Sequence, residues 1–565
     1  MAITFENTEQ KDGLTFKLYR GEGMALAAFD LDKAKVDDSF VGFAVEYRPP
    51  GAADYFTLTN RLAFHYEGAN KGKERFPTTR APLQKFRWTH VPRDVEKGTY
   101  RYRLTAMYAT DPKDPEGSLK AGAVVKNEIS LEPETHAGIL NIGFTRGFAS
   151  SQAYHDRFKN NPKIIPPDAD KGKGELSFDM KPFEKEYEWL GFEARSLIYQ
   201  TLQTAIDNPK ATVDALVYEL REPTVFRMFQ QLGSRLRIFI DDHEDYGAED
   251  SPESIGAAAL EKAGAEVKRG HFGRQQHNKV LIIKEKNVPT RVLSGSTNFS
   301  LRGLYIQANN ALLFEDDNIA ELYANVFEAY WTAPSKFRSN ELAKQWHLMR
   351  DKKDSRFSFC FSPHSDPALS LSPIAEAINN ARGSVLYSVV FLSQLTGEVR
   401  NALDDVVNRT LFSYGVAQRT GELSVQKPDG STGLVPFDYL AKNAPYPFDQ
   451  EWSGGDGNMV HHKFVVTDFN GSSPKVFTGS SNLAAGGEKA NGDNLILIED
   501  RRVAISYAIE ALRMFDHFHF RSKAHSSKFV LKLQGPPTSD EIRPWWSTYY
   551  VRDHVKARDR KLFIS

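Results

Sequence analysis

Residues 277–298 begin His277-Asn278-Lys279 and end Gly295-Ser296-Thr297-Asn298, and residues 461–482 begin His461-His462-Lys463 and end Gly479-Ser480-Ser481-Asn482. Gly303 and Asn310 follow the first stretch, and Gly487 and Asn494 follow the second, so seven polar or glycine positions recur at an offset of 184 residues. The residues between them have diverged. Chance explains such a repeat poorly, and the repeat predicts one site built from two halves.

Short apolar runs, rich in β-branched residues, follow each His-x-Lys at 280–283 and 464–466 and are typical of buried strands. Side chains alternate along a strand, so His277 and Lys279 share one face, and the same holds for the second copy. Second strands at 291–293 and 475–477 end at the Gly-Ser-x-Asn positions, where glycine allows a close approach of backbone and ligand. Each half therefore presents its polar side chains at strand ends.

Two imidazoles and two ammonium groups that meet at one point suit a phosphodiester. Lys279 and Lys463 supply charge for the non-bridging oxygens, because an ammonium group is a compact donor. Hydroxyl and amide groups would hold the phosphorus as it becomes five-coordinate, and the candidates are Ser296, Asn298, Ser480 and Asn482. Imidazole titrates near neutral pH, so one histidine can attack and the other can protonate the leaving oxygen. This chemistry requires no metal and no other cofactor.

These residues resemble the phospholipase D superfamily, the HxKxxxxD or HKD proteins. The second copy, from His461 to Asp468, fits that motif completely, whereas Lys284 stands where the first copy would have Asp. In the family this Asp supports the structure around the motif, so the difference bears on local packing more than on catalysis. The resemblance covers residues 190–525 and implies an α/β fold of two units related by pseudo-twofold symmetry, with one cleft between them.

The family also places an acidic or amide residue eleven positions after the motif Asn, and here these residues are Asn309 and Asp493. If each contacts the histidine of the opposite half, as in the similar tyrosyl-DNA phosphodiesterases, Asp493 pairs with His277 and Asn309 with His461. A carboxylate stabilises the cation that forms on a phosphorylated imidazole better than an amide does. We therefore expect His277 to be the nucleophile and His461 the general acid.

Composition places limits on the other properties. The 565 residues carry 72 basic and 73 acidic side chains, a net charge of −1, so no global basic field indicates nucleic acid or an anionic membrane. The single cysteine, Cys360, excludes an intrachain disulfide, and we expect a buried thiol and no disulfide-linked partner. The sequence has no secretory signal at its start and no apolar run long enough to span a bilayer, so we expect a cytoplasmic protein, although export without a signal would leave no trace.

The local sequence pattern changes along the chain and indicates domain boundaries. Short strands separated by Pro, Gly and Asp turns predict an all-β, immunoglobulin-like sandwich at 1–135, followed by a connector at 136–190 that runs over the surface or rims the cleft. The two phospholipase D-like halves are assigned to 191–350 and 351–525. A loop-rich stretch at 393–460 precedes His461 and is either a lid or a solvated insertion.

The C-terminal segment, 526–565, contains Pro544-Trp545-Trp546-Ser547-Thr548-Tyr549-Tyr550. Amphipathic aromatic residues beside basic groups suit contact with a membrane surface. They also suit docking of the segment onto its own domain, which is the interpretation we favour.

Three functions remain open at this point. The leading hypothesis is a metal-independent phosphodiesterase that hydrolyses or transfers phospholipid headgroups through a phosphohistidine. The alternatives are a nuclease or DNA-adduct phosphodiesterase with the same machinery, and a non-catalytic binding protein of the same fold. The survival of every His, Lys, Ser and Asn position in both halves argues against the last.

Overall fold

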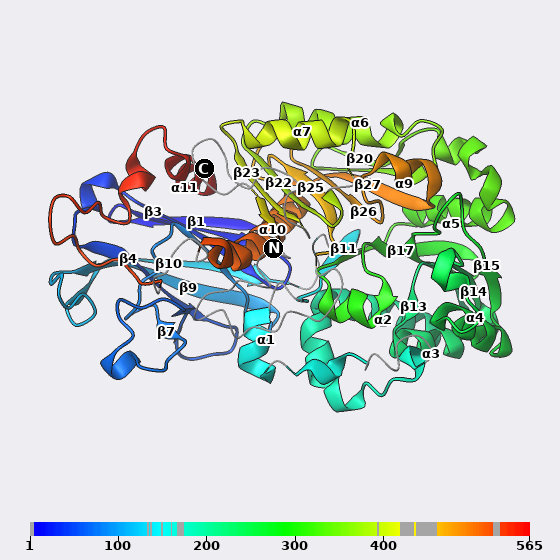
Figure 1. Cartoon of the computed structure of the whole chain (residues 1–565), viewed down its shortest axis with the longest axis horizontal. Helices are drawn as coiled ribbons and strands as arrows, with labels where there is room; N and C mark the ends of the chain where they lie inside the picture. Colours follow the sequence, from blue (N-terminus) through cyan, green and yellow to red (C-terminus); the bar gives the residue numbers. More distant parts are fainter. Residues whose placement is uncertain are drawn as a thin grey trace. The chain divides into compact units, whose positions relative to one another are not determined.

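The computed structural model describes residues 5–132, 135, 138–147, 151–159, 161–166, 174–392, 395–417, 434–436, 460–523 and 531–565. Contacts divide the chain into two compact units (Figure 1). The first comprises Met1–Pro133, Asn443–Gln450 and Phe520–Ser565, and the second comprises Glu134–Lys442 and Glu451–His519. No helix among the described residues combines the length and apolar character needed to cross a bilayer.

The first unit contains two four-stranded antiparallel sheets. One has the order β1-β2-β3-β8 and the other β10-β9-β4-β5, with a small β6-β7 pair beside them. The strands are β1 Glu6–Lys11, β2 Leu14–Arg20, β3 Ala25–Leu31, β4 Phe40–Arg48, β5 Phe56–Thr57, β6 Thr59–Asn60, β7 Phe76–Pro77, β8 Arg87–His90, β9 Gly98–Ala109 and β10 Leu119–Leu131. Buried aromatic residues join the sheets, since the ring of Phe16 in β2 lies 6.5 Å from that of Tyr102 in β9. The likeness to immunoglobulin domains stays a prediction.

The C-terminal segment packs on this first unit. The indole nitrogen of Trp545 donates to the backbone oxygen of Phe40 at 3.0 Å, and Trp546 belongs to the same buried core as Phe16. Helix α11, Val555–Ile564, follows, and the hydroxyl of Tyr19 donates to the backbone oxygen of Phe563 at 2.7 Å. Of the two readings of the aromatic stretch, docking onto the chain's own domain is therefore the one observed.

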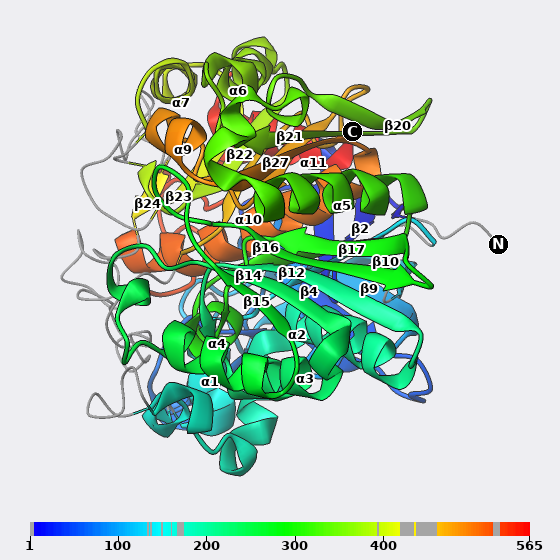
Figure 2. The ribbon, with the colours of Figure 1, turned by 90° about the vertical axis from the view of Figure 1, so that its right-hand side faces the viewer.

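The second unit contains a seven-stranded sheet with the order β11-β19-β17-β16-β12-β14-β15. Its strands are β11 Leu140–Phe144, β12 Ala211–Val217, β14 Leu236–Ile240, β15 Glu266–Arg269, β16 Lys279–Glu285, β17 Val288–Gly295 and β19 Asn310–Phe314, and a short parallel pair joins β13 Leu220–Arg221 to β18 Phe299–Ser300. Its helices are α1 Ser151–Phe158, α2 Glu184–Asp207, α3 Pro223–Leu232, α4 Pro252–Lys262 and α5 Asp317–Thr332. Figure 2 shows α5 along one face of the sheet and α2, α3 and α4 on the other side.

An eight-stranded sheet follows in the same unit, with the order β20-β21-β27-β26-β25-β22-β23-β24. Its strands are β20 His347–Lys352, β21 Ser355–Ser362, β22 Ser384–Val389, β23 Phe412–Ala417, β24 Leu434–Pro436, β25 Lys463–Thr467, β26 Lys475–Gly479 and β27 Asp493–Glu499. Its helices are α6 Ala368–Asn380, α7 Glu398–Val407, α9 Ala485–Ala490 and α10 Arg501–Lys523. The segments β19-β17-β16-β12-β14-β15 and β27-β26-β25-β22-β23-β24 thus have the same order along their sheets.

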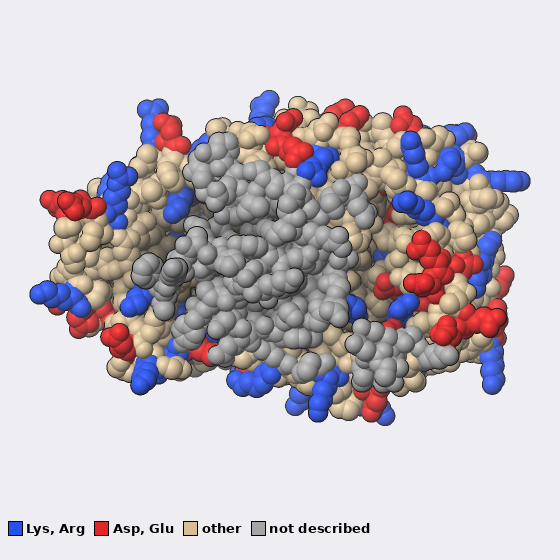
Figure 3. All heavy atoms as spheres, viewed as in Figure 1, with Lys and Arg blue, Asp and Glu red and all other residues tan. Residues whose placement is uncertain are grey.

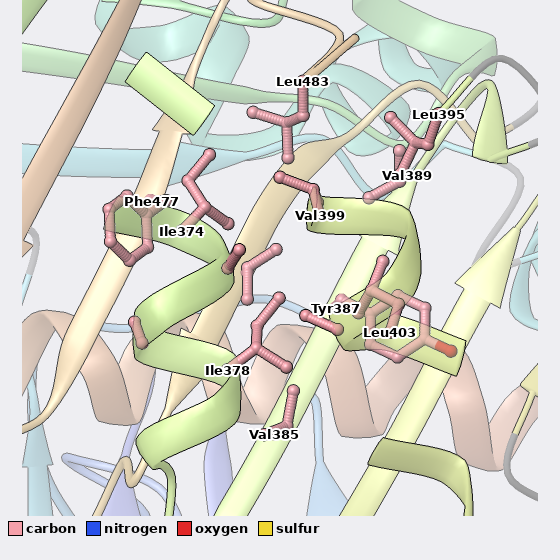
Figure 4. Packing of buried hydrophobic residues seen from close by; sticks show 14 of the residues in the cluster. Ile374, Ile378, Val385, Tyr387, Val389, Leu395, Val399, Leu403, Phe477 and Leu483 are labelled. Atoms are coloured by element: carbon pink, nitrogen blue, oxygen red, sulfur yellow. The ribbon is translucent and has the colours of Figure 1, made fainter. Parts of the chain in front are cut away.

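Helix packing and capping follow from the sequence. Ile374 and Ile378 of α6 and Leu403 of α7 pack against Val385 of β22 in one buried cluster (Figure 4). The Glu-Asp pairs at 315–316 and 499–500 begin the helices α5 and α10, because the Asp side chains accept hydrogen bonds from the first free backbone N–H groups. The motif strands predicted from the sequence are all present, and α5 and α10 follow the last strand of each half.

Two sequence predictions differ from the structure. The segment 136–190 is more than a surface connector, because β11 is buried and pairs with β19 at the edge of the seven-stranded sheet. Arg146, which a surface connector would leave exposed, is 4% exposed and lies over the rings of Trp189 and Phe192. The stretch 393–460 includes α7, β23 and β24, while residues 418–433 and 437–459 lie outside the described residues, so the lid stays a prediction. Cys360 is buried, as expected.

Candidate active site

The two His-x-Lys pairs enter their strands beside the opposite half. His277 precedes β16, and its backbone N–H donates to the oxygen of Gly492 at 2.8 Å. His461 precedes β25, and its N–H donates to the oxygen of Ala308 at 3.1 Å. Gly492 and Ala308 directly precede Asp493 and Asn309 in the sequence, so these backbone bonds bring each histidine next to the predicted partner from the other half.

The imidazole contacts across the halves are those that the sequence predicted. His277 Nδ1 lies 2.8 Å from Asp493 Oδ1, and His461 Nδ1 lies 2.9 Å from Asn309 Oδ1. The Asn309 amide is oriented by its nitrogen, which donates to the backbone oxygen of Gly303 at 2.9 Å. A proton on Nδ1 satisfies both bonds and leaves each Nε2 without it, which is the form that can accept or attack.

The motif serines hold these partners. Ser480 Oγ donates to Asp493 Oδ1 at 2.7 Å, and Ser296 Oγ donates to Asn309 Oδ1 at 2.8 Å. A hydroxyl has one proton to donate, and here each proton is already engaged. Ser296 and Ser480 therefore position the histidine partners in this structure, whereas the sequence led us to expect direct phosphate donors.

The motif asparagines have unused polar atoms. The Oδ1 atoms of Asn298 and Asn482 are buried and have no hydrogen-bond partner among the described residues. A buried amide without partners is unfavourable unless a ligand or water completes it. These two side chains remain candidates for contact with a substrate.

Four cationic or protonatable groups share this environment. Lys279 and Lys463 are 1% and 0% exposed, and Lys463 Nζ lies 3.2 Å from His461 Nε2. Burial lowers the pKa of Lys279 to about 7 and that of Lys463 well below its ordinary range. Each lysine also donates to the backbone oxygen of its own motif histidine, which fixes the ammonium groups beside the rings.

The histidines respond to the same surroundings. Burial, then the charge of Lys279, lowers the pKa of His277 to about 4, although Asp493 opposes the change. Burial and Lys463 lower the pKa of His461 well below its usual value, and the charges of Lys279 and His277 add to that effect. Burial alone would raise the pKa of Asp493, but the charges of His277 and Lys279 hold it below 3.8. A bound anion would favour the protonated forms of the two lysines and two histidines and so oppose these shifts.

Steric contacts explain why glycine precedes each motif serine. Gly295 and Gly479 have φ of +142° and +140°, a region that side chains disfavour. A Cβ on Gly295 would stand 2.5 Å from the backbone oxygen of Asn310, and one on Gly479 would meet the oxygen of Asn494 as closely. These two contacts explain why both copies require glycine before the motif serine.

The eighth position of each HxKxxxxD stretch supports the strands in a different way. Asp468 accepts backbone N–H groups of Arg382, Gly383 and Ser384 at 2.6–3.1 Å and so fixes the start of β22. Lys284 instead pairs with the buried carboxylate of Asp214 in β12. The first half has thus replaced a loop cap with an ion pair between neighbouring strands.

Asn310 and Asn494, the last repeated positions, fasten the two halves together. Asn494 Nδ2 donates to Asn278 Oδ1 at 2.8 Å, and Asn310 Nδ2 donates to Thr478 Oγ1 at 3.0 Å. His462, beside the second motif, is buried and contacts Glu510 at 3.1 Å, which makes it a packing residue. In the sequence, only the repeat indicated that Asn310 and Asn494 have a role.

The sequence did not reveal the contact of Tyr218 with the first motif. The ring of Tyr218, the first residue after β12, lies against both His277 and Lys279. The only sequence signal is its place at a strand end next to the motif strand.

Comparison with known proteins supports the same class of site. Residues 202–331 match the family model described as "Cardiolipin synthase, PLD-like domain". Human mitochondrial cardiolipin hydrolase is 29% identical over 133 residues, which cover 23% of this chain and 49% of the relative. Phospholipase D of Rickettsia felis is 29% identical over 165 residues, 27% of this chain and 66% of the relative. The chain thus spans about half to two thirds of the length of these curated relatives.

Among solved structures, phosphatidylserine synthase of Haemophilus influenzae Rd KW20 is similar with a TM-score of 0.40 and 12% identity, over 66% of this chain and 94% of that one. The family match and the two complete sets of His, Lys and Asn positions define a two-histidine α/β site. These matches support the assignment of the chain to the phospholipase D, or HKD, superfamily.

Proposed function

We propose that the chain is a metal-independent phosphodiesterase of the phospholipase D type that acts through a phosphohistidine. The observation that carries the proposal is the crossed pair of Nδ1 bonds, from His277 to Asp493 and from His461 to Asn309. Both bonds leave Nε2 available, and both rings lie in one electrostatic environment with two buried lysines. Such a site is suited to a single phosphorus atom between two imidazoles.

In the first step, His277 Nε2 attacks phosphorus, an N–P bond forms, and the bond from phosphorus to the leaving oxygen breaks. His461 gives its proton to that oxygen, so an alcohol departs. In the second step, neutral His461 takes a proton from water or an alcohol, whose oxygen displaces His277. The buried charge of Asp493 stabilises the phosphorylated His277 ring, which favours His277 over His461 as the nucleophile.

Substrate charge prepares His461 for its role. Lys463 and Lys279 lower the pKa of His461 in the empty site, and a phosphodiester anion offsets both positive charges. We expect the pKa of His461 to rise on binding, so that the ring carries the proton that the leaving oxygen needs. The lysines also supply the positive charge that a divalent cation would otherwise bring, and their presence disfavours such a cation.

Phospholipid headgroups are the proposed substrate class, with attack by water or transfer to an alcohol. Both curated relatives are named for lipid diesters, cardiolipin hydrolase and phospholipase D. A nuclease is the runner-up, because the same machinery cleaves any phosphodiester. The net charge of −1 disfavours a long polyanion, and the coloured atoms on the face that Figure 3 draws include both basic and acidic groups. Membrane contact and a cytoplasmic location belong to this proposal.

We also propose that the two halves are related by pseudo-twofold symmetry. The equal strand orders around β16 and β25 and the reciprocal Asn309 and Asp493 contacts support it. The proposed boundaries are a sandwich domain at 1–135, a segment at 136–190 that also supplies strand β11 to the first sheet of the second unit, halves at 191–350 and 351–525, and a C-terminal segment at 526–565.

The test incubates the protein in EDTA with short-chain phosphatidylcholine, a bis-nitrophenyl phosphodiester and single-stranded DNA. Headgroup release, together with exchange products in butanol, is expected, and DNA cleavage alone would favour the nuclease. Acid-labile phosphate should be trapped on wild type and on His461→Ala but not on His277→Ala. Trapping on His277→Ala alone would reverse the two roles, and no turnover of any diester would refute the proposed function.

A further inference from the structure

Tyr218 stands at the end of β12, where the strand register places it beside the motif. Val217 pairs with Lys279 between β12 and β16, so Tyr218 extends past the strand toward His277. Its ring lies 4.8 Å from the His277 ring in an edge-to-face arrangement. Lys279 Nζ lies 4.6 Å from the centre of the same ring. One half-buried side chain thus touches both polar members of the first motif.

Other contacts hold the Tyr218 ring in place. Gln275 Nε2 donates to the Tyr218 hydroxyl at 3.1 Å, and Gln275 belongs to the segment that leads into His277. The ring of Tyr246 packs edge-on at 5.0 Å, and the Tyr246 hydroxyl donates to Glu219 at 3.1 Å. The ring therefore cannot swing away from His277 without breaking contacts on two sides.

The second half has no counterpart. Val389 pairs with Lys463 between β22 and β25, just as Val217 pairs with Lys279. The residue after Val389 is Val390, which is 1% exposed and has no π face. Among the described residues, the position next to the paired valine is therefore aromatic in the first half and aliphatic in the second, and the Nδ1 partners of the two histidines differ as well.

We propose that Tyr218 is a positioning residue that fixes the His277 imidazole for attack and keeps the buried Lys279 ammonium charged. This inference rests on the proposed phosphodiesterase function and adds a residue to the same site. A ring in edge contact resists rotation of the imidazole that Asp493 already holds at Nδ1. A cation over a desolvated ring is attracted to its electron-rich face, which favours the protonated lysine.

The charge of Lys279 has several determinants. Carboxylates at strand ends and in the opposite half raise its pKa, namely Asp493, Glu219 and Asp241. Positive or protonatable neighbours oppose its charge, namely His277, His461 and Lys463. Burial is the largest effect and lowers the pKa to about 7, so loss of the Tyr218 face should move the ammonium group toward its neutral form near physiological pH.

The test compares Tyr218→Leu with Tyr218→Phe, which keeps the ring. For Tyr218→Leu we expect kcat to fall about 10- to 100-fold with little change in KM, and the alkaline limb of the rate profile to move down by about 1 pH unit. Tyr218→Phe should stay within about threefold of wild type with an unmoved limb. Tyr414→Leu, which removes a half-buried ring packed on Phe412 and Phe515, is the matched control.

Inorganic tungstate, a tetrahedral dianion, separates this inference from the proposed function because it needs no turnover. Its affinity should weaken as pH rises past the Lys279 pKa, and about 1 pH unit earlier in Tyr218→Leu than in wild type. An unmoved pH dependence in Tyr218→Leu, or equal effects of Leu and Phe, would overturn the inference. If Tyr218→Leu fails to fold, Tyr218→Trp should move the dependence upward, and a downward or absent shift overturns it.

Discussion

Replacing Asp493 by Asn tests the asymmetry between the two histidines most directly. The carboxylate oxygen lies 2.8 Å from His277 Nδ1, and the two side chains are 2% and 5% exposed. Asn keeps the shape and an acceptor atom but removes the negative charge beside the phosphorylated ring.

The magnitude follows from that geometry. A hydrogen bond to a charged group contributes about 1.5–3 kcal/mol, and two unit charges about 4 Å apart interact by about 4 kcal/mol at an effective dielectric constant of 20. The contributions overlap, so we expect a loss of about 3–5 kcal/mol, which is roughly a 10²- to 10⁴-fold fall in kcat. Formation of the phosphohistidine should be the slowed step.

Rapid-quench measurement of the covalent intermediate checks this expectation. Wild type should show a burst, and Asp493→Asn should show slow accumulation with no burst. Asn309→Asp is the matched control, because a carboxylate beside His461 favours the protonated acid and should slow the reaction less than about tenfold. A fall of less than threefold in Asp493→Asn, or an equal fall in both variants, would refute the assignment of His277 as nucleophile.

Three further predictions concern stability. Gly479→Ala should lower the free energy of unfolding by about 2–4 kcal/mol in urea, because the new methyl group meets a backbone oxygen at positive φ; a change below 1 kcal/mol, roughly, would contradict the steric account. The pKa of Lys279 is about 7 in the folded protein and 10.5 in the unfolded chain, so the unfolded chain binds more protons between these values. The free energy of unfolding of the ligand-free protein should therefore rise from pH 7 to about 9.5, and this gain is lost as pH falls toward 7. Melting curves check this, and tungstate should flatten the slope. Trp546→Ala should destabilise the first unit by about 3–5 kcal/mol, because Trp546 is 8% exposed within that core; an unchanged melting transition would show that the C-terminal segment is dispensable.

The repeat allowed the sequence to predict what two halves share. His277, His461 and their lysines were identifiable because each residue has a counterpart at a constant offset. The crossed pairing with Asp493 and Asn309 was implied by the resemblance to the family. The alternation of apolar runs likewise predicted β16, β17, β25 and β26. Local periodicity and a duplicated pattern are both visible in one dimension.

Contacts that occur in only one half carried no such signal. Tyr218 has Val390 as its counterpart, and Lys284 has Asp468, so the repeat hides their roles. Strand β11 comes from a segment whose composition reads as a connector, and only its pairing with β19 makes it part of the sheet. The serine hydroxyls were assigned to phosphate because a sequence does not reveal which acceptor already holds a donated proton.

The reciprocal amide bonds of Asn310 and Asn494 have an evolutionary consequence. In a symmetric dimer of identical subunits, every substitution appears on both sides of the interface at once, so neither histidine can acquire surroundings of its own. A single polypeptide that carries both halves removes this constraint while the asparagines keep the halves in register. Mutation can then adapt one imidazole to bond making and the other to proton delivery. The differences between Asp493 and Asn309, and between Tyr218 and Val390, are consistent with such divergence of the two halves.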